Sequence, residues 1–265
     1  FLDAFLAMSA VAMARKGLTL LALMSVGVRG WGASEKERYV HLQEHLRFEP
    51  KGVLDIGANR GEWSKMIHSI WPSSPIFMIE ANADHKERLL ATGFPFEIGL
   101  LGNESRTVTY FRAPVSVDSG AMQYADTGNG IFPEATASGV HKIFQRETRV
   151  MHTLDSLARG RGQFDLLKLD VQGAEIMVLQ GATNVLRGVH FVQLELAVVP
   201  YNIGAPLWTE VQAFMHRIGF EPYDLLATQR KKGVLIFVDV LFVRHDSPFR
   251  KAAHRKARLI VNRNS

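Results

Sequence analysis

Cysteine is absent from this sequence of 265 residues. The absence excludes disulfides, thiolate zinc sites and cysteine nucleophiles, and it fits a reducing compartment, so we expect a cytoplasmic protein. His-Glu-x-x-His and paired-histidine motifs are also missing, and the ten histidines are scattered along the chain. The sequence therefore predicts no metal site of the histidine or thiolate kind.

The sequence also has no apolar run long enough to cross a bilayer. Residues 4–14 and 18–28 are apolar runs of about eleven residues each, and Arg15-Lys16-Gly17 separates them. A membrane-spanning helix needs about 20 apolar residues, so none is expected here. We expect two short helices that pack on the domain, with a position on a membrane surface as the alternative.

Acidic residues are scarce at the C-terminal end. Residues 244–265 hold seven bases and one acid, a charge of +6, which leaves −1 for the rest of a chain whose net charge is +5. A near-neutral body with a basic tail favours a surface or membrane head groups over a groove for nucleic acid. We therefore expect no nucleic-acid partner, and a peripheral membrane contact through residues 1–30 and the tail stays open as an alternative. A solvated terminal helix is the alternative explanation of these charges.

Strand and helix patterns alternate through most of the chain. An amphipathic helix is predicted over residues 34–47, with Ser34 and Glu37 spaced as a capping box and Tyr39, Leu42 and Leu46 on one face. Alternating elements then follow: strands 52–56, 75–80, 95–100, 106–111, 164–169 and 189–196, and helices 61–71, 83–92, 174–187 (interrupted at Gly181) and 207–218. A closing antiparallel hairpin is predicted from 221–226 and 234–243, with its turn at Arg230-Lys231-Lys232-Gly233. The pattern predicts an α/β fold with a doubly wound, mostly parallel, seven-stranded sheet.

An insertion interrupts this alternation between Arg112 and Arg146. The segment is rich in Pro, Gly, Ser, Asp and Asn, and it is too long for an ordinary connection in a compact domain. We therefore predict a helical extension over residues 1–48, one α/β domain over residues 49–246 that contains the insertion, and a basic tail over residues 247–265.

A glycine turn follows the first sheet strand, at Leu54-Asp55-Ile56-Gly57-Ala58-Asn59-Arg60-Gly61. Glycine lets the backbone turn sharply and approach a ligand closely. Glu80 ends the next strand, 19 residues after Gly61, and is thereby delivered to the same edge of the sheet. The combination indicates a site for an adenosine-bearing cofactor, in which Glu80 accepts hydrogen bonds from the ribose hydroxyls.

The spacing of this turn favours S-adenosylmethionine over a dinucleotide. The NAD fingerprint Gly-x-Gly-x-x-Gly, counted from Gly57, would need glycine where the chain has Asn59 and Glu62. The pattern Asp-x-Gly-x-x-x-Gly is common in methyltransferases that use S-adenosylmethionine, which has no phosphate. A purely structural glycine turn is the alternative, and Trp63 fits the core as well as the site. The predicted cofactor-binding residues are Asp55, Gly57, Ala58, Asn59, Gly61, Trp63, Glu80 and Asp170.

A second signature lies at Lys168-Leu169-Asp170-Val171-Gln172-Gly173-Ala174-Glu175. Together with the glycine turn and three further motifs, this signature makes residues 50–243 resemble the FkbM family of methyltransferases. The three motifs are Thr153-Leu154-Asp155-Ser156-Leu157, Val178-Leu179-Gln180-Gly181-Ala182 and Gly219-Phe220. The resemblance implies a Rossmann-like class I methyltransferase fold and an S-adenosylmethionine-dependent transfer of methyl to oxygen, commonly to a hydroxyl of a sugar, glycan or other natural product. Residues 1–34 and the tail lie outside it.

Methyl transfer to a hydroxyl requires an in-line geometry and a group that takes the proton. The candidate catalytic residues are Asp170, Glu175, Glu195, His152 and Lys168. Lys168, one pleat inside Asp170, is expected to pair with one of the acids. Glu175 equally fits a role at the helix dipole, and the three acids at adjacent strand ends, Glu80, Asp170 and Glu195, could instead hold a divalent cation. Asp155 is expected to cap the short helix at Leu157.

The insertion is predicted to select the acceptor. Tyr124, Phe132 and Phe144 offer aromatic platforms, and the Gly128-Asn129-Gly130 turn offers polar groups, a combination that suits a sugar. A surface loop without a role in binding is the alternative. Tyr201 and Asn202 are expected to form the opposite wall.

The predicted function is an O-methyltransferase acting on a small-molecule or glycan acceptor, at a hydroxyl of a sugar, glycan, glycolipid or other natural product. A non-catalytic donor-binding protein of the same fold is the first alternative. A nucleic-acid methyltransferase is the second, although the Asn/Asp-Pro-Pro-Tyr motif of amino-group enzymes is missing.

Overall fold

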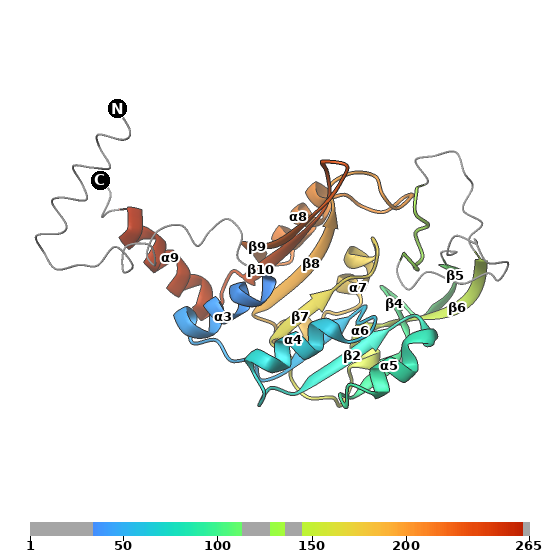
Figure 1. The fold of residues 1–265 in the computed structure, drawn as a ribbon, viewed down its shortest axis with the longest axis horizontal. Helices are drawn as coiled ribbons and strands as arrows, with labels where there is room; N and C mark the ends of the chain where they lie inside the picture. Colours follow the sequence, from blue (N-terminus) through green and yellow to red (C-terminus); the bar gives the residue numbers. More distant parts are fainter. Residues whose placement is uncertain (1–33, 113–127, 136–144, 262–265) are drawn as a thin grey trace, which may run out of the picture.

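The structure is a computed structural model, and it describes residues 34–112, 128–135 and 145–261, with side chains up to residue 255 (Figure 1). The helices expected at residues 4–14 and 18–28 lie outside these ranges. Among the helices within them, none combines the length and hydropathy that crossing a membrane requires. The alternative of a membrane contact through residues 1–30 and the basic tail stays a prediction.

A seven-stranded sheet forms the centre of the molecule, in the order β3-β2-β1-β7-β8-β10-β9 (Figure 1). The first five strands in this order are parallel to their neighbours, and β10 is antiparallel to both β8 and β9. The strands are β1 (Val53–Ile56), β2 (Ile76–Glu80), β3 (Phe96–Ile98), β7 (Leu166–Leu169), β8 (Phe191–Ala197), β9 (Phe220–Lys231) and β10 (Val234–Arg244). The predicted doubly wound α/β fold with a closing antiparallel hairpin is confirmed.

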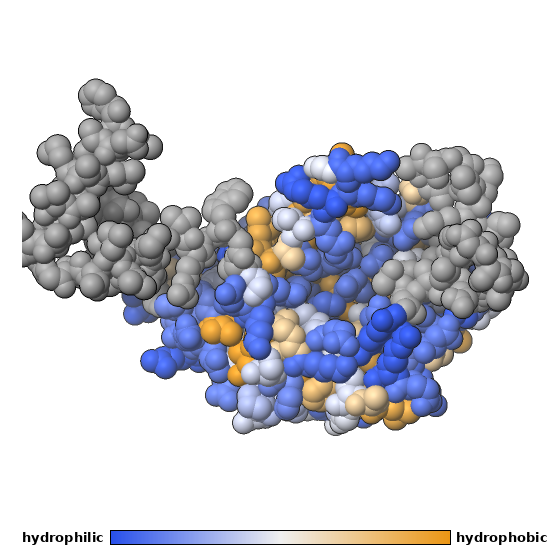
Figure 2. Space-filling model, viewed as in Figure 1, coloured by the Kyte–Doolittle hydropathy of each residue, from blue (hydrophilic) through white to orange (hydrophobic). Residues whose placement is uncertain are grey.

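Helices cover both faces of this sheet. They are α3 (Glu35–Leu46), α4 (Glu62–Ile70), α5 (Lys86–Leu90), α6 (Leu154–Leu157), α7 (Glu175–Gln180), α8 (Trp208–Arg217) and α9 (Pro248–Val261), with short 3-10 turns η1 (Ala83–His85) and η2 (Val185–Arg187). Figure 2 shows that hydrophilic side chains dominate the surface on the side that carries α4 and α5. The apolar sides of the helices therefore turn toward the sheet.

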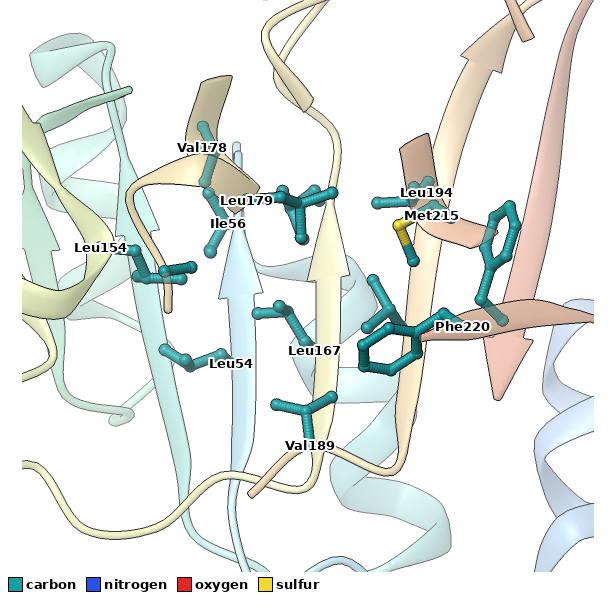
Figure 3. Close-up of a cluster of buried hydrophobic side chains, with 14 of the residues drawn as sticks. Leu54, Ile56, Leu154, Leu167, Val178, Leu179, Val189, Leu194, Met215 and Phe220 are labelled. Carbon is teal, nitrogen blue, oxygen red and sulfur yellow. The ribbon is translucent and has the colours of Figure 1, made fainter. Parts of the chain in front are cut away.

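The face under α6, α7 and α8 is apolar throughout. Alternate residues of β1 and β7, such as Leu54, Ile56 and Leu167, pack there against Val178 of α7 and Met215 of α8 (Figure 3). All five side chains are at most 1% exposed. Apolar area buried in this way is the main stabilising contribution to such a fold.

The opposite face, under α3, α4 and α9, combines apolar and polar side chains. Tyr39 of α3 and Trp63 of α4 pack there with Phe191 of β8. In the same layer Asp55 of β1 lies opposite Lys168 of β7, and Lys168 lies opposite Gln193 of β8. A row of polar residues thus crosses the middle of three central strands.

Helix α3 follows its sequence closely. The Ser34 hydroxyl accepts the backbone N–H of Glu37, and the Glu37 carboxylate accepts the backbone N–H of Ser34 at 2.7 Å, so the predicted capping box is present. Tyr39, Leu42 and Leu46 are its buried residues, as the spacing predicts. The hairpin turn between β9 and β10 is also where expected, because Lys232 and Gly233 both have positive φ (49° and 82°).

A second, three-stranded sheet differs from the prediction. It has the order β4-β6-β5, with β4 (Leu100–Gly102), β5 (Arg106–Arg112) and β6 (Gln145–Thr153). The single strand expected at 95–100 is wrong, because the chain leaves the large sheet at Gly99 and continues in β4 of the small one. Strand β6 was not expected, since its first six residues alternate only between exposed and half-buried.

The expected capping role of Asp155 at α6 is also corrected. The hydroxyl of Thr153 caps α6 by accepting the backbone N–H of Ser156. The Asp155 carboxylate instead accepts the backbone N–H groups of Asn184 (2.9 Å) and Val185 (3.0 Å). It therefore ties α6 to the start of η2.

Candidate functional site

A cavity of about 330 Å³ opens at the carboxyl ends of β1, β2, β7 and β8. Strand order reverses between β1 and β7, and open α/β sheets bind ligands at such a point. The cavity is lined by Ile56, Gly57, Asn59, Ile79, Glu80, Ala81, Gly99, Leu100, Leu101, Tyr110, Gly128, Asn129, Gly130, Ile131, Glu134, Asp170, Val171, Gln172, Ala174, Glu195, Tyr201, Gln229 and Phe237. The structure thus brings together five predicted site residues: Gly57, Asn59, Glu80, Asp170 and Glu195.

The glycine turn forms one side of the cavity. Gly57, Asn59 and Gly61 all have positive φ (74°, 50° and 75°). A Cβ at Gly57 would lie 1.8 Å from the carbonyl oxygen of Asp170, so packing of the turn against the end of β7 excludes a side chain here. Gly57 and Asn59 line the cavity, whereas Gly61 begins α4 and Ala58 packs in the core.

Glu80 is held in the cavity wall by two backbone amides. Its Oε2 accepts the N–H of Asn59 and its Oε1 accepts the N–H of Asn82, both at 2.7 Å. Burial raises the pKa of this carboxyl, and the two amide donors oppose that shift. Each carboxylate oxygen has a second lone pair, so Glu80 can accept further hydrogen bonds from a ligand.

Lys168 lies behind the cavity, between two carboxylates. Its Nζ is 3.4 Å from Asp170 Oδ2 and 3.8 Å from Asp55 Oδ1. Burial lowers the pKa of the Lys168 ammonium, but Asp170 and Asp55 more than offset this, so its pKa lies above the ordinary value. The expected pairing of Lys168 with an acid is present, and the lysine itself does not line the cavity.

Asp55 is fully buried below the cavity wall and does not line it. Its Oδ2 accepts a hydrogen bond from the Ser64 hydroxyl of α4 at 2.7 Å. Burial raises the pKa of the Asp55 carboxyl, while Lys168 and Ser64 lower it. In this structure Asp55 links β1 to α4, the strand and the helix on either side of the glycine turn. Its side chain does not reach the cavity, where the ligand contact was expected.

Glu195 accepts hydrogen bonds from two side-chain amides. Its Oε1 accepts the side-chain amide of Gln229 at 2.7 Å, and its Oε2 accepts that of Gln172 at 3.2 Å. The same Gln172 nitrogen also donates to Asp170 Oδ1 at 3.1 Å. Gln172 has a φ of 55°, a conformation that costs a non-glycine residue energy and that aims its amide at both acids.

Glu175 serves the loop rather than the cavity. Its Oε1 accepts the backbone N–H groups of Val171 (3.3 Å) and Gly173 (3.2 Å), and the side chain does not line the cavity. Burial raises the pKa of this carboxyl to about 7. Both hydrogen bonds turn the Glu175 carboxylate back to the strand-to-helix turn, so its catalytic role stays a prediction that its position does not support.

Trp63 and His152 are two further predicted site residues that do not line the cavity. Trp63 is 8% exposed, packs in the core against Tyr39, and donates its indole N–H to Glu35 (3.1 Å) and Gln193 (3.0 Å). His152 lies in β6, the central strand of the small sheet. The donor contact expected of Trp63 and the base role expected of His152 therefore find no support in their positions.

Residues 128–135 of the insertion cross the cavity. Gly130 pairs with Phe111 of β5, and Glu134 pairs with Asn202 in the loop after β8. The Asn202 side-chain amide also donates to the carbonyl of Phe132 at 3.0 Å. Asn129 and Tyr201 line the cavity, as expected of acceptor residues. Tyr124 and Phe144 lie outside the described residues.

The lining residues that the sequence prediction missed include Tyr110, Gln172, Gln229 and Phe237. Gln172 was available, because it lies within the second signature between two named acids. Gln229 and Phe237 come from the closing hairpin, where a register shift between Leu235 and Phe237 sets which side chains reach the cavity. No local pattern in the sequence predicts such a shift.

The alternative of a divalent cation can be examined within the described ranges. There, no group of three or more His, Asp or Glu side chains is arranged to hold a metal ion. The three acids expected at adjacent strand ends already accept hydrogen bonds from the protein, since Glu80 accepts two backbone amides while Asp170 and Glu195 share the Gln172 amide.

Comparison with known proteins decides the family. Residues 55–222 match the model of the methyltransferase FkbM domain, which spans the sheet from β1 to the start of β9. The chain belongs to the FkbM methyltransferase family. Glu35, Gln229, Phe237 and Asp239 lie outside the matched segment. Among curated proteins, none matches the chain.

Solved structures include the FkbM methyltransferase of Methylobacillus flagellatus KT, with a TM-score of 0.44 and 11% identity over 72% of this chain. The chain covers 43% of that protein. The 1,6-didemethyltoxoflavin-N1-methyltransferase of Burkholderia thailandensis, solved with S-adenosylhomocysteine, has a TM-score of 0.42 and 13% identity over 92% of this chain and 89% of its own. The precorrin-6y C5,15-methyltransferase of Geobacter metallireducens GS-15 has a TM-score of 0.39 and 14% identity over 81% and 90%.

Proposed function

We propose that this FkbM methyltransferase uses S-adenosylmethionine to methylate a hydroxyl of a sugar, glycan, glycolipid or other natural product. One observation carries the proposal. A single cavity at the strand-order reversal combines Glu80, held by two backbone amides, with the linked carboxylates of Asp170 and Glu195. The first group suits a ribose, and the second suits a hydroxyl that loses a proton.

The described lining residues fit an adenosyl donor better than a dinucleotide. Glu80 retains lone pairs for two ribose hydroxyls, and Leu100, Leu101 and Tyr110 offer apolar surface for the adenine. No Lys, Arg or His is among these lining residues, so a pyrophosphate would find no cationic partner. When bound, S-adenosylmethionine supplies a methyl group on a positively charged sulfur.

The chain's own residues then divide the work on the acceptor. Asp170 is paired with Lys168 and still lines the cavity, which makes it our candidate for the group that takes the hydroxyl proton. Glu195 differs, because burial and the neighbouring Asp170 and Asp239 raise its pKa to about 9. Its carboxyl group lies where it can share a hydrogen bond with the acceptor hydroxyl and so orient the acceptor oxygen.

The wall next to Glu195 suits a sugar. The rings of Tyr201 and Phe237 meet edge to face with centroids 4.9 Å apart, and both residues line the cavity. Gln229 and Asn129 add side-chain amides. Aromatic surface beside hydrogen-bonding groups matches the apolar faces and the hydroxyls of a carbohydrate.

Transfer of a tritiated methyl group tests the proposal. The protein is incubated with labelled donor and with separate pools of neutral sugars, glycans and glycolipids, and the product is treated with alkali. We expect an alkali-stable ether, and we expect Asp170→Asn to slow its formation by about 10²-fold or more. Asp246→Asn, on the exposed surface, is the matched control with an unchanged rate.

Two results would decide against the proposal. Alkali-labile label would indicate a methyl ester on a carboxylate acceptor instead of an ether. Donor binding without transfer to any pool would favour the alternative of a donor-binding protein that lacks the reaction.

A further inference from the structure

The cavity carries negative charge without a matching base on its walls. Its titratable side chains include four carboxyl groups, those of Glu80, Glu134, Asp170 and Glu195, and no Lys, Arg or His is among the described lining residues. Two cations lie just outside the walls: Lys168, behind Asp170 and also facing Asp55, and Arg149, which donates to the carbonyl of Ala81 and lies over the ring of Tyr110. The walls therefore favour a ligand that brings positive charge.

The cavity is small enough for all four carboxyl groups to act together on the charge of a ligand. A volume of about 330 Å³, taken as a sphere, is roughly 9 Å across, which is close to the Debye length of about 8 Å at physiological ionic strength. A charge on a ligand inside it thus interacts with all four carboxyl groups with little screening. Glu80 is buried and the other three residues are half-buried, which strengthens the interaction further.

Glu195 and Asp170 form the centre of this charge, because the amide of Gln172 ties them together. Four charged groups face Glu195: Lys168 in β7, Asp170 directly after it, Asp239 in β10 and Glu175 in α7. The titratable Tyr201, in the loop after β8, also faces it. Three of the four charged groups are acids and one is a base. Burial and these acids raise the pKa of Glu195 to about 9. Near neutral pH the cluster therefore carries a proton, which offsets part of its negative charge.

We propose that this carboxyl cluster selects for the positive charge of the methyl donor, and that the donor displaces a proton from the cluster into solvent when it binds. The inference rests on the proposed function, because it takes the cavity as the donor site. Loss of the methyl group leaves S-adenosylhomocysteine with a neutral sulfur. The cluster therefore binds the donor more tightly than the product, which favours product release after each transfer.

Isothermal titration calorimetry tests this inference without an acceptor. The full chain is titrated near neutral pH with S-adenosylmethionine and with S-adenosylhomocysteine, each in phosphate and in Tris, whose heats of ionisation differ. We expect the donor to bind about tenfold more tightly than the product. We also expect the heat of donor binding, but not that of product binding, to change with the buffer because a proton is released.

Two variants assign the effect to the cluster. Glu195→Gln cannot hold a titrating proton, so we expect the preference for the donor to fall toward one and the buffer dependence to vanish. Glu62→Gln is the matched control, because Glu62 lies on the surface of α4 with its side chain 75% exposed, and it should change neither. Should Glu195→Gln fail to fold, the two wild-type titrations still decide.

Other outcomes separate this inference from the proposed function. Equal affinities, or tighter binding of the product, without proton release would overturn the charge selection and leave the methyltransferase proposal standing. If neither ligand binds at millimolar concentration, both the charge selection and the proposed function are contradicted.

Discussion

The two faces of the central sheet bury different kinds of side chain, although the same strands contribute to both. On the side of α6, α7 and α8, Leu54, Leu167 and Leu194 alternate with further apolar residues in one continuous cluster (Figure 3). On the side of α3 and α4, the intervening positions hold polar residues such as Asp55 and Lys168. One pleat further along each strand, that second side reaches the cavity.

The difference separates stability from function. Apolar burial stabilises the fold in proportion to the area removed from water, so the first face is a source of stability. A buried ion pair adds little, since the cost of desolvating its charges offsets their attraction. The polar row is therefore better explained by the cavity above it, where Lys168 neutralises part of the charge of Asp170. Substitutions on the two faces test this separation.

The largest effect is expected from Lys168→Met. The substitution leaves Asp55, which is fully buried, and Asp170 without their shared cation. We expect the free energy of unfolding in urea to fall by about 3–5 kcal/mol. Adding Asp55→Asn to the variant should restore part of this loss. Lys65→Met, at a half-exposed lysine paired with Glu62, is the control and should stay within about 0.5 kcal/mol of wild type. Equal stability of the two variants would contradict the account of the polar row.

A loss of similar size, but confined to stability, is expected on the apolar face. Leu167→Ala removes a fully buried side chain of β7, next to Lys168 in sequence but on the other side of the sheet. The unfolding free energy should fall by about 2–5 kcal/mol. The affinity of the folded variant for S-adenosylmethionine, measured at low temperature, should not change. A loss of affinity here would show that the faces are not separate in function.

The pH dependence of stability tests the cavity end of the sheet through Glu175, which holds the loop between β7 and α7. Burial raises the pKa of this carboxyl from 4.5 to about 7 in the folded protein. Its proton is bound more tightly in the folded state, so the stabilisation is complete below pH 4.5 and is lost as the pH rises through about 7. Glu175→Gln keeps an oxygen for the two backbone amides and does not titrate. Between these pH values, wild type should lose about 3 kcal/mol of unfolding free energy relative to the variant. Parallel curves would contradict the raised pKa.

The smallest effect is expected at Glu35, which lies outside the segment that matches the family. Its Oε1 accepts the indole N–H of Trp63 (3.1 Å) and the side-chain amide of Gln193 (2.8 Å), and so ties α3 to the polar row. Glu35→Ala leaves these donors without this acceptor and should cost about 1–3 kcal/mol in urea unfolding. Glu44→Ala, at an exposed position of the same helix, should cost much less. Similar losses in both would assign the effect to the helix itself.

Much of the fold could be predicted because local patterns agree with it. The apolar strands around Asp55 and Lys168, the capping box at Ser34 and the turn at Lys232 and Gly233 each appear in the structure where the sequence indicates. The strand β6 could not be predicted, because a polar strand paired only in a small sheet lacks an apolar signal. The strand-end residues Glu80, Asp170 and Glu195 followed from the carboxyl-edge rule for parallel sheets.

Other parts of the site depend on tertiary structure. Trp63 and Glu175 follow a glycine turn and so resemble ligand contacts in sequence, yet their hydrogen bonds hold them in the core and in the loop. Gln229 and Phe237 reach the cavity only through the register of the closing hairpin. Such placements depend on how elements pack and not on the residues next to them in the chain.

In the proposed donor site, the cavity above the polar row binds S-adenosylmethionine through Glu80. Equilibrium binding of the donor to wild type, to Glu80→Gln and to the surface control Glu62→Gln tests it most directly, with folding of each variant checked by its thermal melt. Loss of charged hydrogen bonds to the ribose should weaken binding by about 10–100-fold in Glu80→Gln and leave Glu62→Gln like wild type. Unchanged affinity in a folded Glu80→Gln variant, or no binding to wild type at millimolar donor, would contradict the account.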